Sequence, residues 1–310
     1  MRPWVVAFAM LLAPPLAFAQ DHMDWAYPPT PPREPLDNKV LKSVPGSSKK
    51  YTQAQIDDPF NPPDWFPDEH PPMPAVVALG GAKPNGRACA QCHLPSGDGH
   101  PESTSLAGLP AAYLVRQMAA FKNGERKGVR AGVMASISKV LSDAEVQAAA
   151  DYFAALKLTP GLNKVREADK VPGSYVGQGG MRFVLADGPY EPVGSRIIVL
   201  PDNGERAVLR DPKSGFTDFV PKGSIQKGAA LAASGDKTKA CVTCHGPDLK
   251  GAGEVPGITG RTATYIFRQL NDMKTGNRTG GPVEQMKPVV ANLDHNDMIA
   301  LAAYLESLGP

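Results

Sequence analysis

The sequence predicts a mainly α-helical protein, with two helical domains in tandem, a small β-rich segment between them and an extended proline-rich arm at the N-terminus. The main indication is an internal repeat, because a shift of 152 positions brings Cys89 onto Cys241 and Met134 onto Met286 without a gap. Within each copy apolar residues recur at helical spacing, and between the copies short β-favouring runs alternate with turn residues. The chain is therefore interpreted as a duplicated helical domain.

Residues 1–19 are interpreted as an export signal. An arginine near the start precedes an apolar run, and Ala17 and Ala19 form an A-x-A cleavage pattern. Two prolines end the apolar run well short of the ~20 residues that span a bilayer, which argues against an uncleaved anchor helix. We expect cleavage after Ala19 and a periplasmic mature protein.

Residues 20–73 form the expected arm. Their many prolines fix backbone dihedrals and remove hydrogen-bond donors, so that long helices and central strands are excluded. The arm is too aromatic for a solvated linker, and we expect it to lie against the folded body; plain disorder is the alternative. The aromatic residues are Trp25, Tyr27, Phe60, Trp65 and Phe66.

The two helical domains are expected over residues 74–158 and 223–310. Apolar residues at i, i+4 and i+7 predict a helix at 111–122 and its repeat at 262–274. Ser142 and Glu145 have the spacing of a capping box before the last helix of the first copy, and Asp294 caps its counterpart. A short helix at 224–234 should precede the second cysteine pair, whereas its counterpart at 72–82 is weakened by prolines.

The segment from 159 to 222 has a different character. Three runs, at 181–189, 195–211 and 216–221, favour strands and are punctuated by Asp-Gly and Asn-Gly pairs. These pairs are typical of tight hairpin turns. We therefore expect a small meander or hairpins, without any cysteine or histidine to bind iron.

All four cysteines lie in one repeated phrase, Cys-x-x-Cys-His. The first copy ends at His93 and the second at His245. This phrase is the attachment signal for a c-type haem. Two thiols one helical turn apart can each add to a vinyl group on one porphyrin edge, and the next residue then falls beneath the iron. The sequence predicts two covalent haems, attached through Cys89, Cys92, Cys241 and Cys244.

Other uses of the cysteines explain less. The two pairs are far more widely separated than the ~15 to 20 residues usual between pairs of a zinc site. A thioredoxin-type redox pair needs no histidine directly after it in both copies. A structural disulfide accounts for neither the histidine nor the duplication.

The sixth ligand of each iron is assigned to a methionine. Met134 and Met286 lie at the same distance after His93 and His245, in what we expect to be a loop before a capped helix. A thioether ligand raises the reduction potential of a haem iron. A core methionine is the alternative for each. The remaining histidines are interpreted as surface residues: His22, His70, His100 and His295.

Residues 75–157 and 224–310 resemble class I cytochromes c, in particular dihaem cytochromes of the c4 type. The resemblance rests on CAQCH and CVTCH, the YLVRQ and YIFRQ helices, and the segments that begin at Met134 and Met286. It implies that the cysteine-bearing helix crosses the C-terminal helix and that one haem edge is exposed. It also implies a haem environment, with propionate or packing contacts, made of Tyr113, Arg116, Arg126, Tyr265, Arg268 and Arg278.

This chain departs from that family in two ways. Cytochromes of the c4 type join their domains by a short linker, whereas residues 159–222 form a long insertion, so the family's propionate-to-propionate domain interface is not assumed. Pro256 lies where a proline carbonyl often accepts a hydrogen bond from the axial histidine, but the first copy has Thr104 there. The partner of His93 is therefore left open.

The sequence predicts an electron carrier rather than an enzyme. A formal net charge of +2 gives no broad basic field for nucleic acid, and membrane association is peripheral at most. Two six-coordinate haems would pass single electrons between a donor and an acceptor, such as a cytochrome bc1-type complex, a dehydrogenase or a terminal oxidase. The alternatives are a cytochrome subunit of a dehydrogenase complex, and a dihaem peroxidase or thiosulfate-oxidising enzyme, which would need a weak or open sixth ligand.

Overall fold

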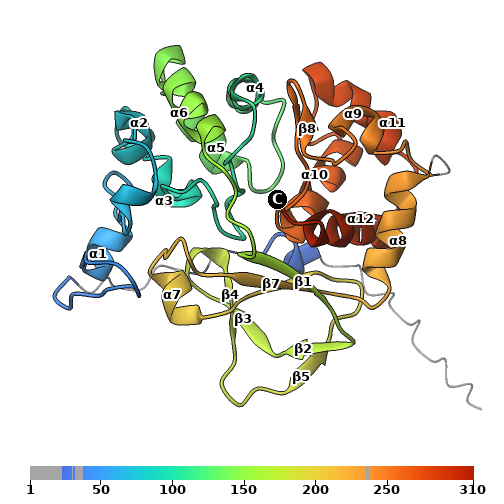
Figure 1. Cartoon of the computed structure of the whole chain (residues 1–310), viewed down its shortest axis with the longest axis horizontal. Helices are drawn as coiled ribbons and strands as arrows, with labels where there is room; N and C mark the ends of the chain where they lie inside the picture. Colours follow the sequence, from blue (N-terminus) through green and yellow to red (C-terminus); the bar gives the residue numbers. More distant parts are fainter. Residues whose placement is uncertain (1–22, 30, 32–37, 235–236) are drawn as a thin grey trace, which may run out of the picture.

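The computed structural model of the 310-residue chain describes residues 23–29, 31, 38–234 and 237–310. The predicted signal over 1–19 and His22 lie outside the described residues. Figure 1 shows the helices of the two copies side by side, with the strands of the connecting segment beneath both. In the described ranges, no helix has both the length and the hydropathy needed to cross a membrane.

The first copy contains the predicted helices. Ser142 and Glu145 form the predicted capping box, in which the Ser142 side chain accepts from the Glu145 N–H and the Glu145 side chain accepts from the Ser142 N–H. The helix expected at 72–82 shrinks to four residues, in agreement with its prolines. The helices are α2 (Ala75–Ala78), α3 (Ala90–His93), α4 (Ala111–Lys122), α5 (Gly132–Ser138) and α6 (Asp143–Ala155).

The second copy repeats this order. Asp294 caps its last helix in a second capping box with Asp297. The α-helices are α8 (Ser224–Ala233), α9 (Val242–His245), α10 (Ala263–Lys274), α11 (Lys287–Val290) and α12 (His295–Ser307), with a 3-10 turn, η4 (Gly281–Met286), and a two-residue ladder, β8 (Gly251–Ala252) with β9 (Val255–Pro256).

The helix that packs across α12 is α8, not the cysteine-bearing α9 that the family resemblance implied. Gly228 allows the close approach, because a Cβ atom at this position would lie 2.0 Å from the Ala300 carbonyl oxygen of α12. Only a residue without a side chain fits at such a crossing. Helix α9 instead lies beside β8 and β9.

The connecting segment is a small sheet with two flanking ladders. The sheet has the order β1 (Asn163–Glu167), β7 (Phe216–Val220), β6 (Ile198–Pro201), and β1 runs parallel to β7 with Asn163 opposite Phe216. The ladders pair β2 (Lys170–Pro172) with β5 (Tyr190–Pro192) and β3 (Ser174–Val176) with β4 (Arg182–Val184) across the 3-10 turn η3 (Gln178–Gly180).

One expected turn is wrong. Asn203-Gly204 does not close a hairpin; Asn203 caps the helix α7 (Gly204–Val208), its side chain accepting a hydrogen bond from the Arg206 N–H. Asparagine serves equally well in a tight turn and at a helix N-terminus, so the dipeptide alone could not decide.

The buried apolar residues form two main clusters that do not follow the repeat. The first copy has its own core, which includes Leu114, Ile137 and Phe153. The second copy shares one core with the connecting segment, because Ile198 and Val220 of the sheet pack with Phe267 and Ile299 of α10 and α12. The connecting segment is thus built onto the second copy.

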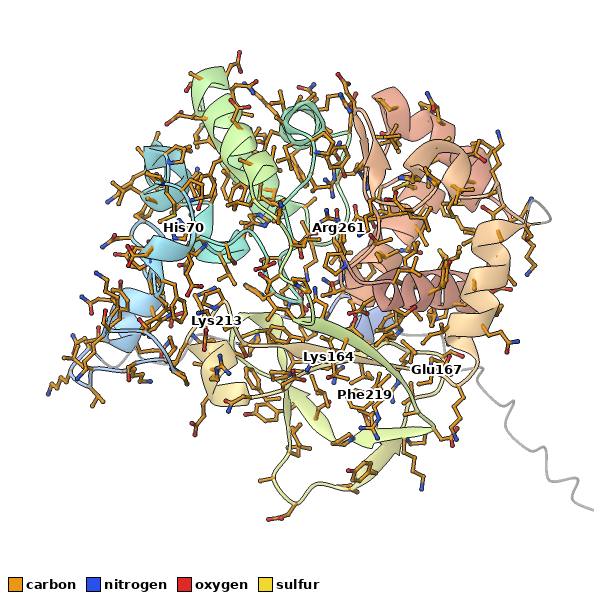
Figure 2. The ribbon with its side chains drawn as sticks, viewed as in Figure 1. His70, Lys164, Glu167, Lys213, Phe219 and Arg261 are labelled. Atoms are coloured by element: carbon orange, nitrogen blue, oxygen red, sulfur yellow. The ribbon has the colours of Figure 1, made fainter. Side chains whose placement is uncertain are left out.

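The described part of the arm touches all other parts of the molecule. It contains the turns η1 (Met23–Trp25) and η2 (Pro67–Glu69) and the short helix α1 (Gln53–Ile56). Trp25 joins the core of the second copy, and Trp65 donates from Nε1 to the Leu209 carbonyl of the connecting segment. His70 lies beside α6 and Lys213 beside the arm (Figure 2), and Lys213 pairs with Glu69 at 2.6 Å.

Candidate haem sites

The two attachment phrases fold alike. In each, the first cysteine stands just before a one-turn helix that ends at the histidine, so that both thiols and the imidazole project from a single turn. All four cysteines are free thiols. Burial raises the pKa of Cys89 to about 12 and also raises the pKa of Cys241. The reactive cysteine of a thiol-disulfide enzyme has a lowered pKa. The raised pKa values of Cys89 and Cys241 therefore do not favour a redox pair.

Both predicted axial histidines are held in the same way. The Nδ1 atom of His93 lies 2.8 Å from the carbonyl oxygen of Thr104, and that of His245 lies 2.8 Å from the carbonyl oxygen of Pro256. A carbonyl can only accept, so Nδ1 carries the proton and Nε2 is left as the ligand atom. The partner of His93, left open by the sequence, is therefore the backbone of Thr104.

Burial lowers the pKa of both histidines, although the carbonyl hydrogen bond opposes this shift. The neutral imidazole is consequently favoured in both copies. Neutral imidazole is the form that coordinates iron.

The two methionines lie at matching positions, but not in loops. Met134 is in the short helix α5, and Met286 ends the 3-10 turn η4 immediately before α11. Both are half-buried and pack against the core of their own copy. Met134 and His93 line one cavity of about 350 Å³, together with Cys92. This cavity presents a thiol that could attach to a haem vinyl group, and an imidazole and a thioether that match the axial donors of a cytochrome c.

The same cavity contains polar atoms that have no hydrogen-bond partner among the residues the structure describes. Both ring nitrogens of His100 are buried without a hydrogen bond, as is Nε of Arg210 and of Arg278. Buried polar groups are normally paired, so these atoms indicate a polar ligand. The carboxylates of a haem fit this need, and the lining of the cavity therefore suits the cofactor chemically.

His100 corrects a prediction. It was interpreted as a surface residue, yet its ring is buried in the wall of the cavity. Burial, and after it the charge of Arg210, lowers its pKa to about 3. The sequence carried no signal for this placement. His100 is buried beside Arg210, which lies more than a hundred positions away in the connecting segment.

The six residues expected around the haems divide into three groups. Tyr265, Arg126, Arg268 and Arg278 line the cavity of the first copy. Tyr113 is buried beside it, and its hydroxyl accepts from Arg278 at 3.0 Å. Arg116 is outside the cavity lining and pairs with the exposed Glu254.

Besides lining the cavity, Arg268 connects three parts of the molecule. Its guanidinium is buried between the copies, where it pairs with Glu102 at 3.2 Å and donates to backbone carbonyls of Ala26 and Pro101. One arginine thus joins the arm, the first copy and the second.

The two copies meet through a nearly two-fold set of bonds. The Lys127 N–H donates to the Asn277 carbonyl and the Thr279 N–H donates to the Glu125 carbonyl, both at 2.9 Å, and these pairs exchange under the 152-residue shift. Arg261, visible at the boundary in Figure 2, adds a bond of 2.7 Å to the Ser105 carbonyl. The insertion therefore does not keep the copies apart, contrary to the doubt raised by its length.

Comparisons with known proteins indicate the family of the chain. The family model for cytochrome c matches residues 80–157 and 225–309. A relative named thiosulfate dehydrogenase electron acceptor, from Thiomonas intermedia, is 29% identical over 74% of this chain and 83% of its own length. Cytochrome c4 of Pseudomonas aeruginosa is 27% identical over 75% of this chain and 88% of its own.

Among solved structures, the thiosulfate dehydrogenase TsdBA of Marichromatium purpuratum aligns at 28% identity with a TM-score of 0.47. The alignment covers 71% of this chain and 36% of that one. The family model matches more than half of the chain and both repeats, each with its own attachment phrase. The protein therefore belongs to the cytochrome c family and is a c4-like dihaem cytochrome.

Proposed function

We propose that the protein is an exported electron carrier with two His/Met-ligated haems, His93 with Met134 and His245 with Met286. The single observation that carries this proposal is the matched geometry of the two copies, with the same carbonyl bond at each histidine and a methionine at the same repeat position. When bound, the haem irons supply one-electron chemistry. These four side chains would hold the two irons, and an iron with both ligands in place would have no coordination position for a substrate.

The donor is proposed to be a dehydrogenase, with oxidation of thiosulfate as the first reaction to test. This rests on the relatives that are named as electron acceptors of thiosulfate dehydrogenase, in Thiomonas intermedia and Stutzerimonas stutzeri. The acceptor is proposed to be a terminal oxidase or another respiratory complex. In this arrangement the chain takes electrons from the enzyme and catalyses no reaction itself.

The domain organisation is proposed as a cleaved signal over 1–19, an arm over 20–73, cytochrome domains over 74–158 and 223–310, and a connecting segment over 159–222. The cores support treating the first cytochrome domain as a separate unit. They also support treating the connecting segment and the second domain as one folding unit, because both contribute to one cluster.

Two measurements test the proposal. The intact mass of the protein from a periplasm competent in haem attachment should show two haem additions on a chain that begins at Gln20. A single addition would show that one of the two attachment phrases carries no haem. Purified thiosulfate dehydrogenase with thiosulfate should then reduce both haems at a rate that rises with enzyme concentration. Reduction by thiosulfate alone, without the enzyme, would instead assign the oxidation to this chain and overturn the carrier proposal.

A further inference from the structure

The two attachment phrases differ sharply in exposure although they are repeats of one another. In the first, Ala90 and Gln91 are 1% and 3% exposed. In the second, the matching Val242 is 45% exposed, and Thr243 and Cys244 are also exposed. The two vinyl-derived thioether bonds of a c-type haem lie at this helix, so covering the helix covers the haem edge attached to it.

A single arginine of the connecting segment is central to the cover over the first phrase. Nη1 of Arg210 donates to the Gln91 carbonyl at 2.7 Å, inside the phrase itself. Nη2 of Arg210 lies 3.5 Å from Oδ1 of Asp57 in the arm. The connecting segment and the arm therefore meet on the first phrase.

Further bonds fix this cover in place. Asp57 is buried and accepts from Gln53 of the arm at 2.9 Å and from Gln178 of the connecting segment at 2.7 Å. The Ala88 N–H, next to the first cysteine, donates to the Pro59 carbonyl of the arm at 2.8 Å. Arg210 itself has a φ of 55°, a left-handed conformation that costs free energy for a residue other than glycine. The surrounding contacts hold it there.

In the described part of the chain, the second phrase has no such cover. Across residues 23–29, 31, 38–234 and 237–310, the hydrogen bonds made by residues 241–244 join them only to neighbours in their own copy, such as the bond of 2.9 Å from the Cys241 N–H to the Ala232 carbonyl. The connecting segment packs against the second copy through its sheet, which lies below α12 in Figure 1, whereas α9 lies at the top of the view.

We propose that Arg210 and the arm seal the first haem edge, so that redox agents reach the protein at the second attachment phrase, around Val242. The cover is a property of the arm and the connecting segment, which is why one repeat is closed and its copy is open. The partner that uses the open edge is the one-electron redox protein of the proposed function, and this part of the inference rests on that proposal.

Access can be measured without any partner. In NMR spectra of the oxidised holoprotein, each set of haem methyl signals is assigned by through-space contacts to side chains of its own copy, and a neutral gadolinium chelate is then titrated in. We expect broadening to be several-fold greater at the second haem. Equal broadening of the two haems, or greater broadening at the first, would overturn the proposal.

The role of Arg210 is tested by Arg210→Gly. Glycine keeps the left-handed backbone without strain while the side chain is removed. Broadening at the first haem should rise toward that of the second. Arg196→Gly is the matched control, because Arg196 lies in the same segment and, among the described residues, bonds within that segment, donating from Nε to the Val193 carbonyl at 3.0 Å. An unchanged first haem in a folded Arg210→Gly protein would show that Arg210 does not close the edge.

The partner's approach is tested separately with purified thiosulfate dehydrogenase as the electron donor. Val242→Glu should lower the second-order rate of reduction about tenfold, the effect of ~1.4 kcal/mol. Val184→Glu, at a valine with 48% exposure in the connecting segment, should leave it unchanged. Equal rates of reduction for the two variants would show that the donor does not dock at the edge of the second haem. A wild-type protein that this enzyme fails to reduce would reject the proposed donor, while the gadolinium result would stand.

Discussion

Arg126 and Arg278, which occupy the same position in the two repeats, share their hydrogen-bond acceptors across the domain boundary. Each donates to Oε1 of both Gln117 and Gln269, at distances of 2.9 to 3.0 Å. The guanidinium groups of the half-buried Arg126 and the buried Arg278 are thereby held next to each other at the wall of the haem cavity. Burial and the neighbouring charge of Arg278 lower the pKa of Arg126. Asp272, in the same cavity wall, supplies one anion near the pair, and haem carboxylates would provide others.

This pair predicts a change in reduction potential. Arg126→Gln or Arg278→Gln removes a cation that disfavours the more positive, oxidised iron, so the potential of the nearest haem should fall by tens of millivolts. For a one-electron couple, 59 mV corresponds to about 1.4 kcal/mol. Spectroelectrochemical titration measures the change, and Arg116→Gln, at an arginine outside the cavity lining, is the matched control. An equal fall in the control would reject a specific role for the pair.

The axial assignment predicts paired effects of two substitutions. Met134→Ala should open the iron of the first copy, lower its potential and allow carbon monoxide to bind, because loss of the thioether removes the ligand that raises the potential. Met286→Ala should do the same in the second copy. Absorption and carbon monoxide difference spectra report the change, and in each variant the other haem serves as the internal control. A variant with both haems still six-coordinate would reject its methionine as a ligand.

A buried acid pair between the connecting segment and the second copy predicts a pH dependence of stability. Burial raises the pKa of Asp218 to about 7, and burial together with Asp218 raises that of Glu306. A folded-state pKa above the unfolded value of about 3.9 means that the folded state holds the proton more tightly. Stability should fall as pH rises from about 4 to about 7, by an amount of the order of a few kcal/mol.

Denaturant unfolding of the holoprotein across this pH range checks this prediction. Asp218→Asn keeps the size of the side chain and removes its ionisation, so its stability should depend less on pH and exceed that of the wild type at pH 8. A wild-type stability that rises steadily from pH 4 to pH 7, with the variant following in parallel, would contradict the assignment.

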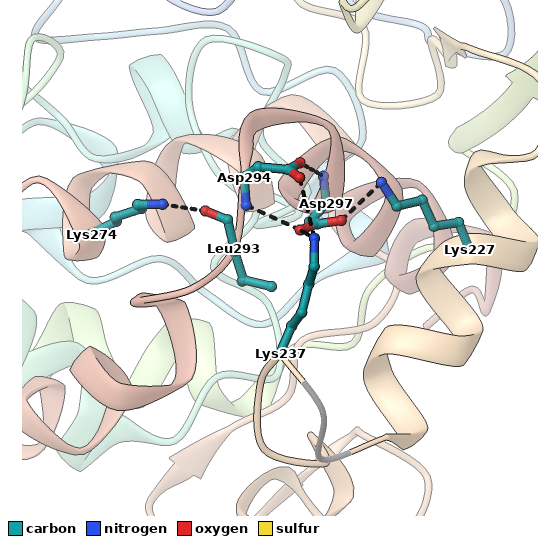
Figure 3. A network of polar contacts seen from close by, with 6 residues as sticks. All are labelled: Lys227, Lys237, Lys274, Leu293, Asp294 and Asp297. Atoms are coloured by element: carbon teal, nitrogen blue, oxygen red, sulfur yellow. Dashed lines mark hydrogen bonds and ion pairs between the residues drawn. The ribbon is translucent and has the colours of Figure 1, made fainter.

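A second acid, at the start of α12, predicts the opposite dependence. Asp297 is buried, which alone would raise its pKa, but bonds to Lys227 at 2.8 Å and Lys237 at 2.7 Å hold the pKa well below its usual range (Figure 3). Its contribution to the stability of the folded state is present above pH 4 and is lost as the pH falls below 4. Asp297→Asn should cost about 2 kcal/mol at pH 7, because it removes the anion to which the half-exposed Lys227 and Lys237 donate.

Thermal unfolding at pH 7 and at pH 3 measures this loss. Glu284→Gln, in the exposed pair of Glu284 with Lys287, is the control and should have little effect, since exposed pairs contribute at most about 1 kcal/mol. Similar losses in the two variants would show that burial of Asp297 has no special role.

Features fixed by short-range spacing were predictable. The attachment phrases, the helices at 111–122 and 143–155, and the capping box at Ser142 depend on residues a few positions apart, and the structure contains them as predicted. The repeat also indicated that the two sites are alike, and the carbonyl bonds of His93 and His245 agree.

Features that depend on contacts between distant segments were not predictable. The strand at 163–167 was missed because it is short and polar and is fixed only by parallel pairing with β7. The buried position of His100 and the cover made by Arg210 require the connecting segment to fold back over the first copy, and no local pattern encodes that contact. For the same reason, the segment expected to be separate from the haem sites contributes to the wall of one.

The central claim, two closed one-electron sites in one chain, is tested most directly by a spectroelectrochemical redox titration of the unmodified holoprotein under carbon monoxide. We predict two electrons per chain, taken up in one-electron steps at two low-spin haems, with a titration unaffected by the gas because a sulfur ligand blocks each iron. Carbon monoxide binding to either reduced haem, or uptake of a single electron per chain, would contradict the account.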